Sequence, residues 1–388
     1  MYFVEKTKEI NYLKQFDYPL FVAVLLLSFI GILVLRSAIG VPRVTGMWLK
    51  QAICLAIGVV IAVFISMIDY KDFKILGIML YIASVIMLVL VLVPGIGVKH
   101  GGSQSWLQVP IAGFEFQPSE LAKVAFAVVV PVFLERLKEG KEIGKNVVKL
   151  LFYSMLPIIL ILLQPDIGTA LVFIFAFVVM LFIYGIPYRY FLVSFGVLAV
   201  SVPLLWIFVI PQNSYIRNRI ITFLNPETDL SGAGLQVYRS KMAIGSGQIF
   251  GKGLFHGLRA QDGSTVSSSI YVPKKVNDFI FSVIGEELGF VGSVIVIAII
   301  FFILMRGIYI AMNARDDYGS FMVVCIISML GFHFIENIGM SIGVMPVTGI
   351  PLPFVSQGNS SLLANFLNVG ILLSVSMRRK KTIFNASQ

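Results

Sequence analysis

"VNDFIFSVIGEELGFVGSVIVIAIIFFIL", residues 276–304, is a long apolar run that opens beside an aspartate and carries two adjacent glutamates. The run exceeds the ~20 residues that a helix needs to cross a bilayer core. Further apolar runs occur at 18–35, 48–68, 73–93, 118–134, 150–163, 167–185, 190–210, 319–342 and 356–377. The sequence therefore predicts an all-α polytopic membrane protein with about ten transmembrane helices in a single domain, 1–388.

The composition supports a membrane protein. Of the 388 residues, 58% are hydrophobic and 13% charged, which is too apolar for a soluble fold of this length. The net charge of +10 is explained by membrane topology and anionic lipid, so we expect no nucleic-acid partner. Cys54 and Cys325 lie in apolar runs, which argues against a disulfide framework. The charged N-terminus lacks signal-peptide features, so the first span is expected to remain in the mature protein.

The distribution of Lys and Arg orients the spans. With the N-terminus in the cytoplasm, the inside segments hold 17 basic residues and the short outside segments hold four. Because basic residues favour the cytoplasmic side, both termini are predicted to be cytoplasmic. Residues 211–277 then form one long extracytoplasmic loop between the seventh and eighth helices.

The long loop is basic and rich in glycine. Its segment "GSGQIFGKG" resembles a phosphate-binding loop, but the glycine spacing is wrong and Gly253 stands where Ser or Thr is required. A nucleotide site is therefore not expected. The substrate-binding candidates are cations of this loop and one serine of the turn at 345–361: Arg217, Lys241, Lys252, Lys274, Lys275 and Ser356.

Ionisable residues inside spans are costly, which makes them candidates for function. Glu120 and Lys123 are three residues apart and share a helix face. Asp166 lies at a depth comparable with that of Lys123, so we predict a Lys123–Asp166 ion pair. Such a pair is either architectural or part of a site. Glu120 either orients Lys123 or faces a substrate.

Asp278 stands at the outer end of its span beside the basic loop. It is either a helix N-cap, a position that Asp favours, or a free carboxylate facing a ligand. The turn "MPVTGIPLPFVSQGNSS", residues 345–361, lies on the same side, and irregular backbone at membrane depth is tolerated where it lines a cavity. These features predict an outward-facing site for an anionic lipid. His333 and Glu336 are expected to be a packed polar pair, and no metal site is assigned.

The runs "FQPSELAKVAF", "QPDIGTAL", "NPETDLSGAGLQVYRSKMAIGSGQIFGKG", "NDFIFSVIGEELGFVG" and "NIGMSIGVMPVTGIPLPFVS" together resemble the SEDS family of polytopic peptidoglycan glycosyltransferases. The motif "PVTGIPLP" is more similar to that of the elongation branch (RodA) than to that of the division branch (FtsW). This chain departs from the family's usual residues at Lys274, at Asn277 and in "SQGNSS". The resemblance implies that Asp278 is the essential catalytic carboxylate and that Lys123 and Asp166 form a buried salt bridge.

The implied activity is polymerisation of lipid II into glycan strands on the outer face of the bacterial cytoplasmic membrane, in cell elongation. Asp278 would be the general base. Lys and Arg side chains, with or without a divalent cation such as Mg²⁺ or Mn²⁺, would stabilise the negative charge on the leaving pyrophosphate. The implied partners are a class B penicillin-binding protein and other elongation-complex proteins. The alternatives are a lipid II flippase or transporter, and a scaffold without chemistry of its own.

Overall fold

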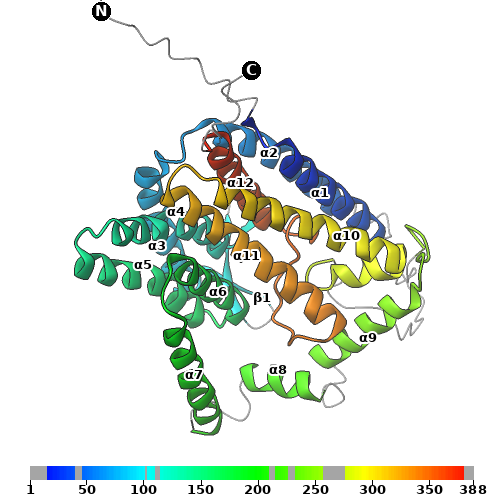
Figure 1. Ribbon diagram of the computed structural model, residues 1–388. Helices are drawn as coiled ribbons and strands as arrows, with labels where there is room; N and C mark the ends of the chain where they lie inside the picture. Colours follow the sequence, from blue (N-terminus) through cyan, green and yellow to red (C-terminus); the bar gives the residue numbers. More distant parts are fainter. Residues whose placement is uncertain are drawn as a thin grey trace, which may run out of the picture.

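The computed structural model describes residues 15–39, 46–100, 103–109, 114–208, 215–225, 232–256 and 276–379, which form a mostly helical bundle (Figure 1). The helices are α1 (Tyr18–Ile39), α2 (Gly46–Met67), α3 (Phe73–Leu92), α4 (Pro118–Lys138), α5 (Ile143–Leu163), α6 (Ile167–Tyr184), α7 (Tyr188–Phe208), α8 (Tyr215–Leu224), α9 (Ala233–Ser246), α10 (Ile280–Met312), α11 (Asp317–Ile342) and α12 (Asn359–Met377). The strands are β1 (Gly97–His100), β2 (Ser103–Val109) and β3 (Phe114–Phe116).

The ten predicted spans correspond to the ten long helices, α1 to α7 and α10 to α12. Eight of these are long and apolar enough to cross a membrane by composition alone. The others are α4, which carries charged side chains, and α7, whose apolar stretch Tyr188–Ser201 is shorter. The predicted class, a polytopic helical membrane protein, is confirmed.

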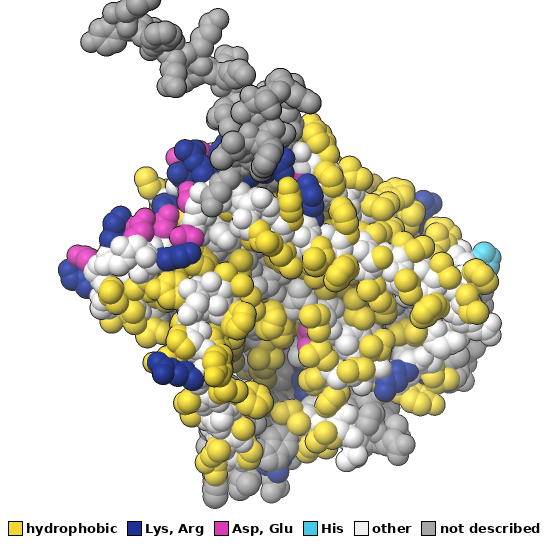
Figure 2. Space-filling model, in the orientation of Figure 1, with side chains coloured by type: hydrophobic (Ala, Val, Ile, Leu, Met, Phe, Trp, Pro, Cys, Tyr) yellow, Lys and Arg dark blue, Asp and Glu magenta, His cyan; other side chains and the backbone are white. Residues whose placement is uncertain are grey.

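The centre of the bundle is formed by α4, α11 and α12, most of whose residues are buried. The outer helices expose apolar side chains, and Figure 2 shows them covering most of the visible face. Charged side chains gather at the upper left of that view, over the inner ends of α3 and α4 and the α10–α11 turn. Figure 1 shows α7 projecting away from the bundle. This distribution is that of a protein whose flanks face lipid rather than water.

Asp17 joins three helices at the cytoplasmic ends. It is 2% exposed, and its carboxylate accepts hydrogen bonds from Arg306 Nε at 2.9 and 3.0 Å and from Ser376 Oγ at 3.4 Å. It also accepts the Leu20 N–H at 3.1 Å, at the start of α1. The beginning of α1 and the ends of α10 and α12 therefore lie together, in agreement with the predicted topology.

A small antiparallel sheet, in the order β1-β2-β3, amends the expectation that the chain is all helical. Leu107 pairs with Gly97 on one side and with Phe116 on the other. Gln104 Nε2 donates to the Val91 carbonyl at 2.7 Å, which fastens β2 to the outer end of α3. The sequence carried a signal for this hairpin in Gly101–Gly102, two glycines directly between β1 and β2.

The helix α10 is broken at Gly289, where φ is 67° and ψ is −164°. The segment 247–253 runs beside the break and supplies the missing hydrogen bonds. The N–H groups of Lys252 and Gly253 donate to the carbonyls of Glu286 and Glu287 at 3.0 and 2.9 Å. The N–H groups of Phe290 and Val291 donate back to Gln248 and Ile249 at 2.9 and 3.0 Å.

The two backbones approach so closely that a Cβ on Gly289 would lie 2.2 Å from the Gly251 nitrogen. The bonded residues 286–291 lie roughly 9 to 16 Å along α10 from its start, at 1.5 Å per residue. Part of the predicted extracytoplasmic loop 211–277 therefore lies alongside a span rather than beyond its end. The close approach accounts for Gly247 and Gly251, where a Cβ would lie 1.9 Å from the Gly285 oxygen and 2.2 Å from the Glu287 oxygen.

Candidate functional site

The outer ends of the helices surround a cavity of about 580 Å³. Its walls come from α2, β2, β3, α4, α6, α8, α11, the segment before α10, and the turn between α11 and α12. Its charged lining residues are Lys50, Glu115, Glu120, Asp166, Arg219 and Asp278, with His333 as a further titratable group. The cavity lies on the side that the Lys and Arg distribution assigns to the cell exterior, which is the side on which the sequence predicts a site.

Asp278 belongs to a short non-helical segment just before α10. The carbonyls of Val276 and Asn277 accept hydrogen bonds from the Gln357 N–H at 2.9 Å and from Ser356 Oγ at 2.6 Å. The N-cap position of α10 is occupied by Phe279, and no side chain caps the helix there. The N-cap interpretation of Asp278 is therefore not supported, and its carboxylate lines the cavity instead.

Gly349 lies next to both Asp278 and Arg219. A Cβ placed on it would be 3.6 Å from Asp278 Oδ2 and 4.0 Å from an Arg219 terminal nitrogen. The φ of Gly349 is +81°, a conformation that side chains rarely adopt, so glycine is favoured there on two grounds. This glycine lets a carboxylate and a guanidinium share one wall of the cavity.

The predicted Lys123–Asp166 ion pair is wrong. Lys123 is 3% exposed, and its Nζ lies 2.9 Å from Glu120 Oε2 and 3.0 Å from His333 Nε2. Asp166 instead precedes α6 and accepts hydrogen bonds from Thr169 N at 3.1 Å, Thr169 Oγ1 at 2.9 Å and Gln117 Nε2 at 3.2 Å. The first N–H groups of a helix lack helical partners, and a carboxylate placed there satisfies them.

The error has a geometric cause. The fifth span is predicted over residues 150–163, whereas α5 begins at Ile143, so the predicted depth of Asp166 rests on a span that is too short. Equal depth also leaves open which way each side chain points around its helix. Of the two roles considered for Glu120, the structure has it pairing with Lys123 while also lining the cavity.

The other predicted binding residues that the structure describes lie away from the cavity wall or are engaged elsewhere. Lys252 Nζ is paired with Glu286 Oε1 at 2.8 Å, and the side chain of Lys241 packs against Gly343. Ser356 Oγ accepts the Leu352 N–H at 2.8 Å while it donates to Asn277, so its hydroxyl fastens the turn. Arg217 is not among the cavity-lining residues. Lys274 and Lys275 lie outside the described residues.

Several lining residues were missed by the sequence analysis: Lys50, Trp106, Glu115, Gln117, Arg219, His333 and Thr348. Trp106 and Glu115 are brought to the site by the sheet, and Arg219 by the short helix α8. The sequence did contain a signal for Arg219, because it is a basic residue of the loop 211–277, which is predicted to lie on the same side as the site.

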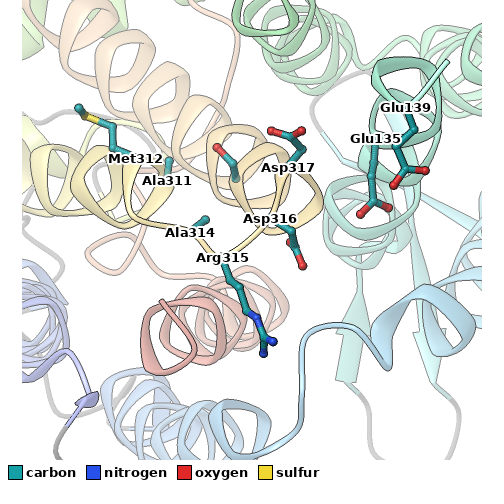
Figure 3. Close-up of a pocket in the computed structure, with 9 residues that line it drawn as sticks. Glu135, Glu139, Ala311, Met312, Ala314, Arg315, Asp316 and Asp317 are labelled. Carbon is teal, nitrogen blue, oxygen red and sulfur yellow. The ribbon is translucent and has the colours of Figure 1, made fainter. Parts of the chain in front are cut away.

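A second cavity, of about 360 Å³, lies at the cytoplasmic ends of α4, α10 and α11 (Figure 3). Its acids are held by cations or a phenol: Lys138 Nζ lies 2.7 Å from Asp317 Oδ1, and the Tyr70 hydroxyl donates to Asp316 Oδ2 at 2.8 Å. Burial and then the bond to Asp316 raise the pKa of Tyr70, which keeps this phenol protonated as the donor. These pairs tie helix ends together, and the cavity lies on the side opposite to Asp278.

The described residues bring together no three His, Cys, Asp or Glu side chains in the manner of a metal site. The cavity carboxylates therefore do not form a ready-made ligand set for Mg²⁺ or Mn²⁺.

A bundle of spanning helices with a polar cavity at their outer ends defines a multi-pass membrane protein with an outward-facing site. The chain belongs to the family described as cell cycle proteins (FTSW_RODA_SPOVE), which matches residues 18–381. It is thus a multi-pass protein of the bacterial cytoplasmic membrane.

The relatives of the chain carry three kinds of name. It is 37% identical over 328 residues to "Stage V sporulation protein E" of Bacillus subtilis, covering 84% of this chain and 86% of the relative. It is 35% identical to "Peptidoglycan glycosyltransferase MrdB" of Escherichia coli, covering 90% of each chain. It is 34% identical to "Probable peptidoglycan glycosyltransferase FtsW" of Trichlorobacter lovleyi, covering 94% of each.

Solved structures share the fold. A chain from a study of polymerisation and crosslinking by a peptidoglycan synthase complex matches with a TM-score of 0.77 and 30% identity, covering 93% of this chain and 97% of that one. The rod shape determining protein RodA of Thermus thermophilus matches with a TM-score of 0.66 and 26% identity, covering 95% and 98%.

Proposed function

We propose that this chain polymerises lipid II into glycan strands at the outer face of the cytoplasmic membrane, with Asp278 as the general base. The observation that carries the proposal is the Asp278 carboxylate on the wall of an outward-facing cavity that Arg219 also lines. The broader assignment, an enzyme of the peptidoglycan glycosyltransferase class, rests on the family and on the names of its relatives.

The reaction requires a general base and positive charge near the leaving group, and the cavity contains both. A hydroxyl of the acceptor sugar attacks the anomeric carbon of the donor, forming a new C–O bond while the C–O bond to the pyrophosphate breaks. Asp278 takes the proton of that hydroxyl, as a general base within hydrogen-bonding reach would. Arg219 and Lys50 supply positive charge toward the negative charge that grows on the departing pyrophosphate.

The finer role that we propose is cell elongation with a class B penicillin-binding protein as partner. The sequence "PVTGIPLP" favours the elongation branch. The identities to the sporulation, MrdB and FtsW relatives, 37%, 35% and 34%, are too similar to separate the branches. The matching chain of a peptidoglycan synthase complex is consistent with a partner of that kind.

A lipid II flippase is the second candidate, because a polytopic bundle with buried charges also suits a transporter. The positions of the charged cavity residues argue against it. They line the outer half of the bundle, and the acids at the cytoplasmic ends are engaged in pairs that hold helices together. The location of the cavity therefore favours chemistry at the outer surface.

The test is polymerisation of purified lipid II by the detergent-solubilised protein, alone and with its cognate transpeptidase. Asp278→Asn and Asp278→Ala are expected to lower the rate at least about 10²-fold, the usual contribution of a positioned base. Asp72→Asn, at an exposed cytoplasmic aspartate, is the matched control and should polymerise as wild type does. Normal polymerisation by Asp278→Asn would remove the base from this role. A wild type that makes no polymer, yet moves fluorescent lipid II across vesicles, would establish the flippase instead.

A further inference from the structure

Asn337 is a buried amide on α11 that uses both N–H groups of its side chain. It is 0% exposed, and Nδ2 donates to the Asp278 carbonyl at 2.8 Å and to the Ile350 carbonyl at 2.8 Å. A side-chain amide nitrogen carries two hydrogens, so this donor is fully used. Asn337 itself is not among the cavity-lining residues and does not reach the reacting groups.

The carbonyl that Asn337 holds belongs to the residue that carries the candidate base. In the first turn of α10 the Ser282 N–H donates to the Phe279 carbonyl at 3.0 Å, whereas the Asp278 carbonyl accepts from Asn337 Nδ2. The two preceding carbonyls, of Val276 and Asn277, are held by the turn residues Gln357 and Ser356. Asn337 is thus the contact that fastens this segment to the central helix α11.

The second carbonyl belongs to the turn that lies against the Asp278 carboxylate. Ile350 directly follows Gly349, whose Cβ position lies 3.6 Å from Asp278 Oδ2, and Pro351 lines the cavity. The side chain of Asn337 therefore binds two backbone segments at once. The segment at Asp278 carries the carboxylate, and the segment at Gly349 and Ile350 lies against that carboxylate.

We propose that Asn337 is a positioning residue that holds the Asp278 carboxylate at its place on the cavity wall. The inference rests on the proposed function of Asp278. Proton transfer depends steeply on geometry, and a displacement of about 1 Å can cost about 10²-fold in rate. Loss of the Nδ2 donor would remove the hydrogen bonds to both carbonyls and loosen the Asp278 peptide, while the groups that contact lipid II remain in place.

The first test compares kcat and KM for lipid II in three variants. Asn337→Leu removes the amide, Asn337→Asp keeps its shape but replaces the donor with an oxygen, and Asn337→Gln keeps an NH₂ group. We expect the first two to lower kcat about 10- to 100-fold with KM changed less than about twofold, and Asn337→Gln to retain more activity than either. Asn146→Leu is the matched control, since Asn146 is 2% exposed and donates to the Lys141 carbonyl at 2.7 Å on the cytoplasmic side.

Positioning and general stabilisation give different results. If the activity loss in the Asn337 variants only follows the fall in melting temperature, as calibrated by Asn146→Leu, the positioning proposal is overturned. It is also overturned if Asn337→Leu or Asn337→Asp keeps wild-type kcat, or if all three variants are unfolded, which would make the residue architectural.

The second test needs no catalysis, so it survives a failure of the proposed function. The two buried native cysteines are removed by Cys54→Ala and Cys325→Ala, and a thiol is introduced by Asp278→Cys. Its alkylation rate by a small water-soluble reagent should change at least about threefold when Asn337→Leu or Asn337→Asp is added, and should not change with Asn146→Leu. Equal rates in all backgrounds would show that Asn337 does not position residue 278, whatever the reaction proves to be.

Discussion

The Nζ atom of Lys123 lies 3.0 Å from Nε2 of His333, across the interface between α4 and α11. An ammonium group only donates hydrogen bonds, so the imidazole offers the lone pair of Nε2. Glu120, one helical turn before Lys123, forms an ion pair with the same ammonium, with Oε2 at 2.9 Å from Nζ. The buried charge of Lys123 is thereby compensated within α4 and α11, which leaves Asp166 to serve α6 and the cavity.

The first prediction concerns this buried pair. Lys123→Met strands the Glu120 carboxylate, and removing one partner of a buried ion pair costs about 3–5 kcal/mol of unfolding free energy. Thermal unfolding in detergent should show a large loss, and adding Glu120→Gln should recover much of it. The matched control is Lys145→Met, because the Lys145–Glu142 pair has the same spacing but is exposed on the cytoplasmic side. Equal effects of Lys123→Met and Lys145→Met would contradict the prediction.

The second prediction separates a helix cap from an ion pair at Asp166. An Asp-to-Ala change at a capping position typically costs about 1 kcal/mol, whereas Asn caps almost as well as Asp. We therefore expect Asp166→Asn to retain most of the thermal stability that Asp166→Ala loses. Were Asp166 instead paired with Lys123, the neutral Asn variant would be as unstable as the Ala variant, and the melting temperatures distinguish the two cases.

The third prediction concerns the break in α10. A methyl group on Gly289 would meet the Gly251 nitrogen at 2.2 Å, and its φ of 67° is unfavourable for alanine. Gly289→Ala should therefore separate the 247–253 segment from α10 and markedly reduce the yield of folded protein. Gly245→Ala, in α9 where a Cβ meets nothing within 4 Å, is the control and should fold normally. Size-exclusion profiles of the two variants provide the comparison.

The fourth prediction tests Arg219. Removing a preorganised donor that faces developing charge typically lowers kcat by about 10²- to 10³-fold. Under the proposed function, Arg219→Gln should show a loss of that order, and Arg219→Lys a smaller one. Arg217→Gln, two residues away on α8 and not on the cavity wall, should have a clearly weaker effect in the same lipid II assay. A reversed order would move the binding site away from the cavity described here.

Helix positions could be predicted from the sequence because bilayer thickness fixes the length of an apolar run. The start of α1 at Tyr18 and of α4 at Pro118 coincide with the predicted starts. Side-chain partners were harder to predict, because hydropathy gives the depth of a residue and not its direction around the helix. That is why Asp166 was assigned to Lys123, although the three-residue spacing to Glu120 was visible.

The structure brings some of the predicted site residues to one cavity and adds others that were not predicted. Asp166, Asp278 and Glu120 line one cavity, as their common placement at outer helix ends indicated. Trp106 and Arg219 line it from β2 and from the short helix α8, two elements that hydropathy does not predict. Asn337 had no local signal, because its two acceptors are 59 and 13 residues away in sequence.

The segment 247–253 has a consequence for biogenesis. The chain is synthesised from its N-terminus, so this segment leaves the ribosome before Glu286–Val291, the residues that bond to it. Its amide groups must remain hydrated on the outer side until α10 enters the membrane with its own break at Gly289. The outer half of the protein therefore completes its folding after α10 has inserted, when the segment 247–253 forms its hydrogen bonds with residues 286–291.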